Sequence, residues 1–169
     1  MRRPAVLAAG SITIALTAVA CGGGGGQSGA GPSAGGGSSA TTQPVTRQTG
    51  AATVGVANSK YGKVLVDAQG LSLYLFEADK GSSSTCYKTC AQLWPPLTTD
   101  GAPKVTDGAK GSFLGTTERR DGTTQVTYQG HPLYYYAPDN APGDFRGQDI
   151  DQFGAEWYLV TPSGEAAED

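Results

Sequence analysis

The chain is poor in the residues that most often build catalytic and metal sites. Its 169 residues include one histidine, His131, and one methionine, Met1. Without a second histidine, a zinc or copper site of ordinary composition cannot be assembled. Residues 53–169 contain no G-x-S-x-G motif and no glycine-rich phosphate loop, because the long glycine run lies before them. These absences predict no enzyme and no cofactor, although His131 or a tyrosine could still serve as an axial haem ligand.

Residues 1–20 have the pattern of an export signal. Arg2 and Arg3 precede an uncharged stretch from Pro4 to Val19 that is short for a membrane-spanning helix. Residues 18–21 resemble the lipobox of bacterial lipoproteins, with alanine where leucine is more common at the first position. We therefore predict that Cys21 is lipidated and anchors the protein to the cell membrane outside the cytoplasm. A plain secretory signal and an uncleaved anchor are the alternatives.

Residues 21–52 are predicted to form a disordered tether behind the lipidated cysteine. After Cys21 the segment is rich in Gly, Ser and Thr, lacks aromatic residues and carries one charge, Arg47. Such a composition cannot bury enough apolar surface to offset the entropy of ordering the chain.

All aromatic residues lie in residues 53–169, which are long enough for one compact domain. Without Arg2 and Arg3, ten basic and fifteen acidic residues give a net charge of −5. This charge argues against nucleic acid as the main partner.

The domain repeats itself at an offset of 60 residues. Seven identities recur without a gap, pairing residues 62, 66, 69, 70, 73, 74 and 79 with residues 122, 126, 129, 130, 133, 134 and 139. The two copies span about residues 53–100 and 113–162. We expect a mainly β fold of two tandem, pseudo-symmetric β-meanders with short helical segments.

Each copy has the two-residue period of a strand. In residues 71–76 and 133–136, Leu73, Leu75, Leu133 and Tyr135 alternate with Tyr74, Phe76, Tyr134 and Tyr136. Turns are predicted at Gln69-Gly70, at Asp121-Gly122 and at Gln129-Gly130. Residues 86–93 allow one or two helical turns before Trp94-Pro95-Pro96 ends them. Residues 140–154 are predicted to be a loop, and residues 156–161 a strand.

Two segments carry a resemblance to a known family. Residues 73–79, LYLFEAD, and residues 133–139, LYYYAPD, both fit Yx(FWY)xxD, with Tyr74, Phe76 and Asp79 answered by Tyr134, Tyr136 and Asp139. This motif is typical of secreted bacterial repeats that are predicted lipoproteins of unknown function. The resemblance implies an extracytoplasmic location and no reaction.

The remaining candidate sites have both structural and chemical interpretations. With Cys21 lipidated, Cys86 and Cys90 are expected to form a structural disulfide, with a redox-active dithiol or a metal-binding pair as alternatives. Asp79 and Asp139 are expected to accept hydrogen bonds from the amides of the loops that follow them, rather than to act as acid and base. Acidic residues in 139–151 make weak calcium binding conceivable, but solvated turns fit better.

Aromatic residues concentrate in the second copy, where strand alternation would expose some rings unless both faces are covered. Tyr135, Trp157 and Tyr158 are the candidates for a ligand surface. The sequence therefore favours a non-enzymatic envelope module that binds an unknown protein or a small ligand. The alternative is a redox or electron-transfer accessory that uses a bound cofactor or the Cys86–Cys90 pair.

Overall fold

Short strands dominate the computed structural model, which describes residues 50–106 and 108–168. The predicted signal, Cys21 and most of the tether lie outside the described residues. The elements are β1 (Thr53–Ser59), β2 (Gly62–Asp67), β3 (Tyr74–Phe76), α1 (Thr89–Leu93), β4 (Lys104–Val105), a 3₁₀ helix (Gly111–Phe113), β5 (Leu114–Glu118), β6 (Thr124–Tyr128), β7 (His131–Pro132), β8 (Ile150–Gln152) and β9 (Ala155–Leu159). The mainly β prediction is confirmed. Within the described ranges, no helix is both long and apolar enough to cross a membrane.

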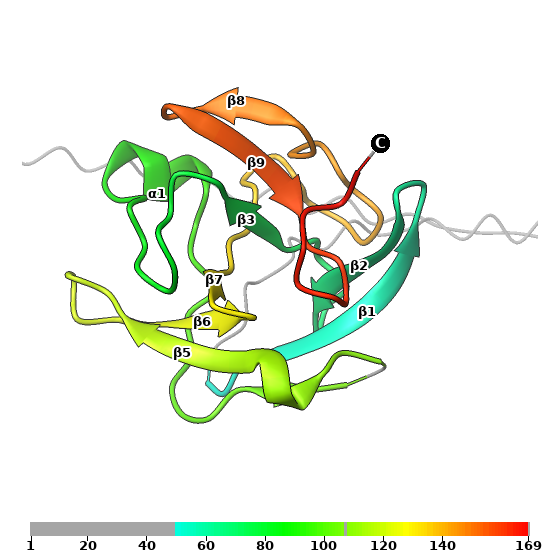
Figure 1. Cartoon of the computed structure of the whole chain (residues 1–169), viewed down its shortest axis with the longest axis horizontal. Coiled ribbons are helices and arrows are strands. Elements are labelled where there is room, and N and C mark those ends of the chain that lie inside the picture. The colour runs from blue at the N-terminus through cyan, green and yellow to red at the C-terminus, as the bar shows by residue number, and fades with distance from the viewer. Residues whose placement is uncertain (1–49, 107, 169) are drawn as a thin grey trace, which may run out of the picture. The chain divides into compact units, whose positions relative to one another are not determined.

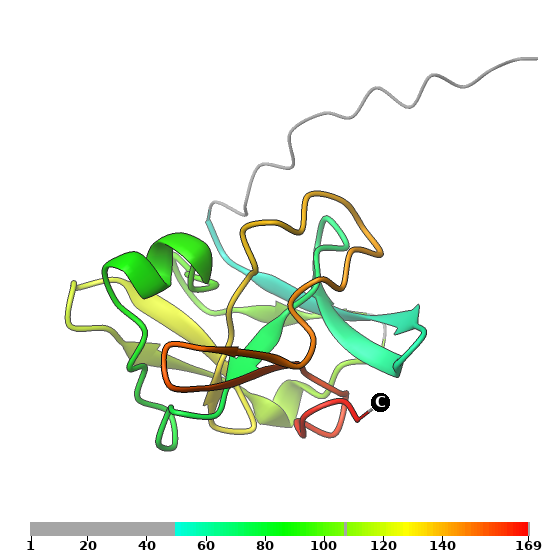
Figure 2. The same cartoon turned by 90° about the horizontal axis from the view of Figure 1, so that it is seen from above.

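The strands form three small sheets with the orders β2-β1-β4, β3-β9-β8 and β5-β6-β7. The β1–β2 and β5–β6 hairpins occupy equivalent places in the two copies and extend in opposite directions (Figures 1 and 2). Strands β4 and β8 were not predicted. The two-residue β4 pairs in parallel with β1, and β8 lies inside the expected loop 140–154, where it pairs with β9.

The predicted turns form, with one difference between the copies. At Gln129-Gly130 both residues have positive φ, and Tyr128 pairs directly with His131. At Gln69-Gly70 only the glycine has positive φ, and the side chain of Asp67 accepts hydrogen bonds from the amides of Gln69 and Leu71. The aspartate thus holds a longer turn in the first copy, whereas Gln129 adopts a left-handed conformation in the second.

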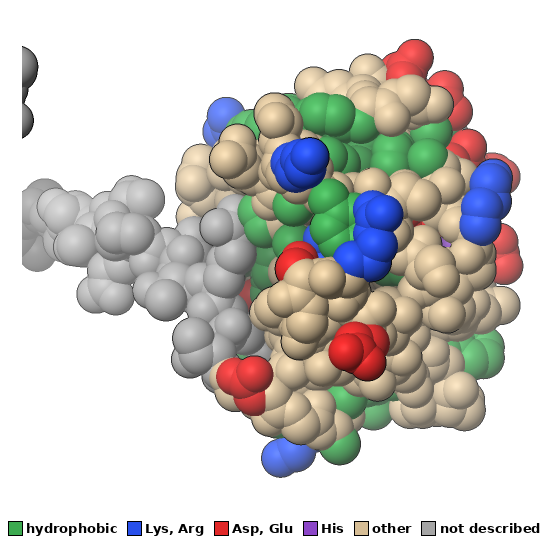
Figure 3. Space-filling model, turned by 90° about the vertical axis from the view of Figure 1, so that its left-hand side faces the viewer, with side chains coloured by type: hydrophobic (Ala, Val, Ile, Leu, Met, Phe, Trp, Pro, Cys, Tyr) green, Lys and Arg blue, Asp and Glu red, His purple; other side chains and the backbone are tan. Residues whose placement is uncertain are grey.

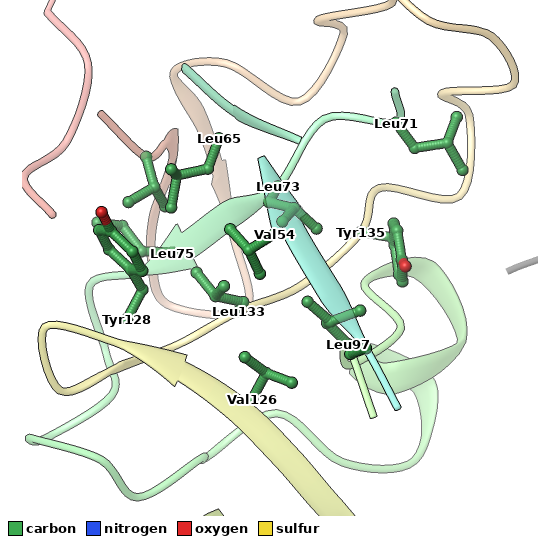
Figure 4. Packing of buried hydrophobic residues seen from close by; sticks show 12 residues of the cluster. Val54, Leu65, Leu71, Leu73, Leu75, Leu97, Val126, Tyr128, Leu133 and Tyr135 are labelled. Carbon is green, nitrogen blue, oxygen red and sulfur yellow. The ribbon is translucent and has the colours of Figure 1, made fainter. Parts of the chain in front are cut away.

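The alternation predicted for residues 71–76 and 133–136 holds, and both faces are covered. Leu73, Leu75, Leu133 and Tyr135 enter one buried cluster, and Figure 4 shows these side chains converging with Val54, Leu65 and Val126. Tyr74, Phe76 and Tyr134 enter a second cluster with Trp94 and Trp157. The central segments of the two copies therefore lie between two apolar layers.

Candidate functional site

The motif tyrosines and aspartates of the two copies bond to each other crosswise. The Tyr74 hydroxyl donates to Asp139 Oδ2 at 2.5 Å, and the Tyr134 hydroxyl donates to Asp79 Oδ2 at 2.6 Å. The backbones of Tyr74 and Tyr134 also exchange two hydrogen bonds of 2.9 Å. Because an antiparallel bridge is locally two-fold symmetric, a pseudo-two-fold axis passes between the two tyrosines. The repeated motif thus encodes contacts between copies.

The second oxygen of each aspartate holds the loop that follows it. Asp79 Oδ1 accepts from the amide and hydroxyl of Thr85, and Asp139 Oδ1 accepts from the amide of Arg146. These bonds match the structural interpretation of the two aspartates. The bonds to the tyrosines were missed by the sequence analysis, although the equal Tyr-to-Asp spacing in the two copies was a visible signal.

Four aromatic rings stack beside these pairs in the order Phe76, Trp157, Trp94, Tyr136, which we name the aromatic column. Successive ring centroids are 4.0, 4.0 and 4.2 Å apart. Tyr74 meets Trp94 edge-on at 5.4 Å, and Tyr134 meets Trp157 edge-on at 5.1 Å. Both indole N–H groups donate to Gln152. The column follows the same pseudo-two-fold symmetry as the Tyr–Asp pairs.

A buried arginine distinguishes the Tyr134–Asp79 pair. The Arg119 guanidinium donates to Ser84 Oγ, Gln125 Oε1 and the Cys86 carbonyl at 2.7 Å each, and its side chain is fully buried. Ser84 Oγ in turn lies 2.8 Å from the Tyr134 oxygen. Arg119 therefore places a positive charge one hydroxyl away from this tyrosine.

The Tyr74–Asp139 pair has a backbone environment instead. The Gly147 amide donates to the Tyr74 oxygen at 3.2 Å, and a Cβ at this glycine would lie within 2.9 Å of both Trp94 and Tyr74. Burial is the main cause that raises the pKa of Tyr74, of Tyr134 and of Asp139. Both phenols therefore stay protonated at neutral pH.

The candidate aromatic surface needs correction. Tyr135 and Trp157 are 3% and 0% exposed, since both faces of their strands are covered, so neither contributes to a surface. Their polar atoms are bonded within the fold, Tyr135 to Asp67 and Trp157 to Gln152. Tyr158 is partly exposed and donates to Glu156, and that bond is the main cause that raises its pKa.

Cys86 and Cys90 form the expected disulfide, and both are buried in the same cluster as Trp94. This burial favours a structural role. Partly exposed His131 lies at the edge of β7, beside Glu77, Asp79 and Glu165 in a shallow cavity. In the acidic loop, Asp144 accepts from the amides of Asn140 and Ala141, which is turn chemistry. Among the residues that the structure describes, no three His, Cys, Asp or Glu side chains are grouped to hold a metal ion.

An open groove of about 840 Å³ is lined by residues of two sheets. Its lining residues include Lys104 and Val105 of β4 and Leu114, Gly115 and Thr116 of β5, with Thr124 beside them. Both β4 and β5 are outermost in their sheets. This groove was not predicted, because nothing in the amino-acid sequence indicated β4.

Backbone groups of both strands face away from their own sheets. Val126 uses its N–H and C=O for Leu97 and Leu133, so its partner Thr116 is not hydrogen-bonded to β6 and directs its own N–H and C=O outward. On β4 the amides of Lys104 and Thr106 donate to β1. The backbone N–H and C=O of the intervening Val105 therefore point outward. The groove is thus bordered by two strand edges that can accept further pairing.

Comparison with known proteins identifies the repeats. A family model described as a secreted repeat of unknown function matches residues 55–98 and 115–161. No curated protein and no solved structure matches the chain.

Proposed function

Because the chain belongs to the family of secreted repeats of unknown function, we propose that it is a lipid-anchored extracytoplasmic module that binds an extended polypeptide segment in the groove between β4 and β5. The observation that carries this proposal is the outward direction of the Thr116 and Val105 backbone groups. An extended peptide can add itself to such an edge through main-chain hydrogen bonds, while neighbouring side chains select its sequence.

The groove also indicates the chemistry of its occupant. Glycine, alanine and proline at residues 101–103, with Gly111, have small side chains or none, so a second backbone can approach. Lys104 is the one charged residue among the described residues of the lining, so the segment carries an acidic side chain or a C-terminal carboxylate beside it. On the face drawn in Figure 3, basic side chains are interspersed with acidic and uncharged ones, which suits a peptide better than a nucleic acid.

Binding rather than catalysis suits the lining residues. Those that the structure describes include no His, Cys, Asp or Glu, the groups that most often transfer protons or attack substrates at neutral pH. The groove therefore offers shape, main-chain bonding and one positive charge.

Peptide display tests the groove. Random linear peptides on phage are selected against the full mature chain, and enriched sequences are synthesised for titration. Thr116→Pro removes an outward amide without breaking the ladder to β6, and Lys104→Glu reverses the groove charge. We expect each variant to weaken binding about tenfold or more. Lys63→Glu is the matched control, because Lys63 is an exposed lysine of the same sheet on β2, outside the groove lining, and should bind as wild type.

Two outcomes would overturn the peptide proposal. One is that no peptide is enriched above the display background. The other is that enriched peptides bind both groove variants as tightly as the wild type. Urea midpoints of the variants establish that any loss of binding occurs in folded protein.

Mass spectrometry of protein extracted from its own membrane tests the anchor. The predicted product begins at Cys21 with acyl groups attached, and it partitions into a detergent phase. Cys21→Ala should abolish both properties. An unmodified N-terminus at any position in the wild-type protein would contradict lipid anchoring.

A further inference from the structure

Both tryptophans of the chain belong to the aromatic column. Trp94 and Trp157 are fully buried, and their nearly parallel rings stack at 4.0 Å. The column reaches the surface at Tyr136, which is partly exposed and lines a cavity of about 230 Å³ together with Asp139. Electron transfer between aromatic rings depends steeply on distance, so rings in contact exchange electrons far faster than rings separated by protein. The column is therefore a continuous path from the surface to both indoles.

Each indole contacts a tyrosine that has a carboxylate partner. Tyr74 meets Trp94 and bonds to Asp139, while Tyr134 meets Trp157 and bonds to Asp79. An oxidised indole can take an electron from a phenol when the phenol proton has an acceptor at the moment of transfer. A carboxylate oxygen at hydrogen-bond distance is such an acceptor.

We propose that the Tyr74–Asp139 pair is a redox-active tyrosine site connected to the surface by the aromatic column. A one-electron oxidant, such as a small radical, removes one electron from the column at its exposed end. Trp94 carries the deficit until Tyr74 supplies an electron, and the phenol proton moves to Asp139 Oδ2. The products are the reduced oxidant, neutral Trp94, a neutral Tyr74 radical and protonated Asp139. A one-electron reductant reverses the step, and the proton returns to the phenol.

The surroundings of the two pairs select Tyr74 over Tyr134. Oxidation with transfer of the proton to a partner makes each Tyr–Asp pair more positive by one charge. Arg119, whose side chain is fully buried, is linked to Tyr134 through Ser84 and opposes this change. Beside the other pair, Arg146 donates its amide to Asp139, but its guanidinium is 65% exposed and pairs with Asp144, so solvent screens its charge. Burial also raises the pKa of Asp139, which makes it a better proton acceptor. This site is independent of the peptide groove.

Flash photolysis provides a direct test on the full mature chain. Ultraviolet photoionisation of tryptophan creates indole radicals only in the column, because the chain has no other tryptophan. We expect first-order decay of the indole radical, matched by growth of tyrosyl absorption and slowed in deuterium oxide. Tyr74→Phe keeps the ring and removes the proton donor, and Asp139→Asn keeps an acceptor oxygen that binds the proton poorly. Each should slow the growth about tenfold or more, which corresponds to at least 1.36 kcal/mol in the barrier.

Tyr87→Phe is the matched control, because Tyr87 contacts Arg119 and Arg120 rather than either indole. It should leave the rate unchanged. Tyrosyl growth that is equally fast in wild type, Tyr74→Phe and Asp139→Asn would overturn the proposal. So would a rate that rises with protein concentration, since transfer would then be between molecules. If Tyr74→Phe fails to fold, the isotope effect on the wild type and the Asp139→Asn rate decide the question.

Discussion

The two Tyr–Asp pairs have the same bond lengths within 0.1 Å and the same position in their repeats, yet their surroundings differ. Tyr134–Asp79 lies in a network of side chains centred on Arg119, close to the Cys86–Cys90 disulfide. Tyr74–Asp139 lies in a loop that supplies backbone amides and a closely packed Gly147. The difference shows that the motif specifies the contact between the repeats. The loop that follows each motif supplies different hydrogen-bond partners to its Tyr–Asp pair.

We expect the largest loss of stability from Arg119→Met, which removes the centre of the network around the Tyr134–Asp79 pair. The substitution keeps much of the volume but leaves the buried Gln125 Oε1 and Cys86 carbonyl, and the part-buried Ser84 Oγ, without their donor. We therefore expect a loss of about 3 kcal/mol in unfolding free energy. Arg120→Met is the matched control, because this exposed neighbour also lies over the Tyr87 ring and should cost about 0.5 kcal/mol. Urea denaturation measures both, and equal losses would contradict the central role of Arg119.

Replacing both Cys86 and Cys90 by serine removes a constraint that only the first loop has. The closed ring is small, so the expected loss is about 2 kcal/mol. Hydrogen exchange should increase in residues 79–93 and remain unchanged in residues 137–154. An equal increase in the two loops would show that they are not stabilised separately.

Gly147→Ala tests how tightly the surroundings of the Tyr74–Asp139 pair are packed. The new methyl group would press on Trp94 and Tyr74, with an expected cost of about 1.5 kcal/mol. Gly111→Ala is the control, because its Cβ would meet only Val105 at 3.5 Å and should cost less than about 0.5 kcal/mol. Similar melting temperatures for the two variants would show that Gly147 is not tightly packed.

The smallest expected effect is on pH dependence. Because burial raises the pKa of Asp139, its carboxyl group binds a proton more tightly in the folded state than in the unfolded chain. The contribution of Asp139 to the unfolding free energy therefore falls as the pH rises, first through the ordinary pKa of an aspartate and then through the raised pKa of Asp139. Asp139→Asn should remove that fall. Hydrogen bonds from Thr123 lower the pKa of Asp121, so Asp121→Asn should remove a contribution that is lost as pH falls. Urea midpoints between about pH 3 and 7 should therefore show opposite slopes, relative to wild type, for the two variants.

Local patterns predicted the elements that depend on local chemistry. The alternation of Leu73 and Tyr74, the turns at the glycines and the short helix before Pro95 follow from period and backbone preference. The exposed aromatic surface was wrong for Tyr135 and Trp157, because a sequence does not show what covers the second face of a strand. The groove depends on β4, a two-residue strand with too little pattern to detect. The crosswise bonds depend on how the repeats pack, which no single repeat specifies.

Double-mutant cycles test most directly whether the motif joins the two repeats. Tyr74→Phe is combined with Asp139→Ala and, separately, with Asp79→Ala, and unfolding free energies are measured in urea. We predict a coupling energy of about 1.5 kcal/mol for Tyr74 with Asp139 and less than about 0.5 kcal/mol for Tyr74 with Asp79. A larger coupling between Tyr74 and Asp79, the two residues of one motif, would contradict the account.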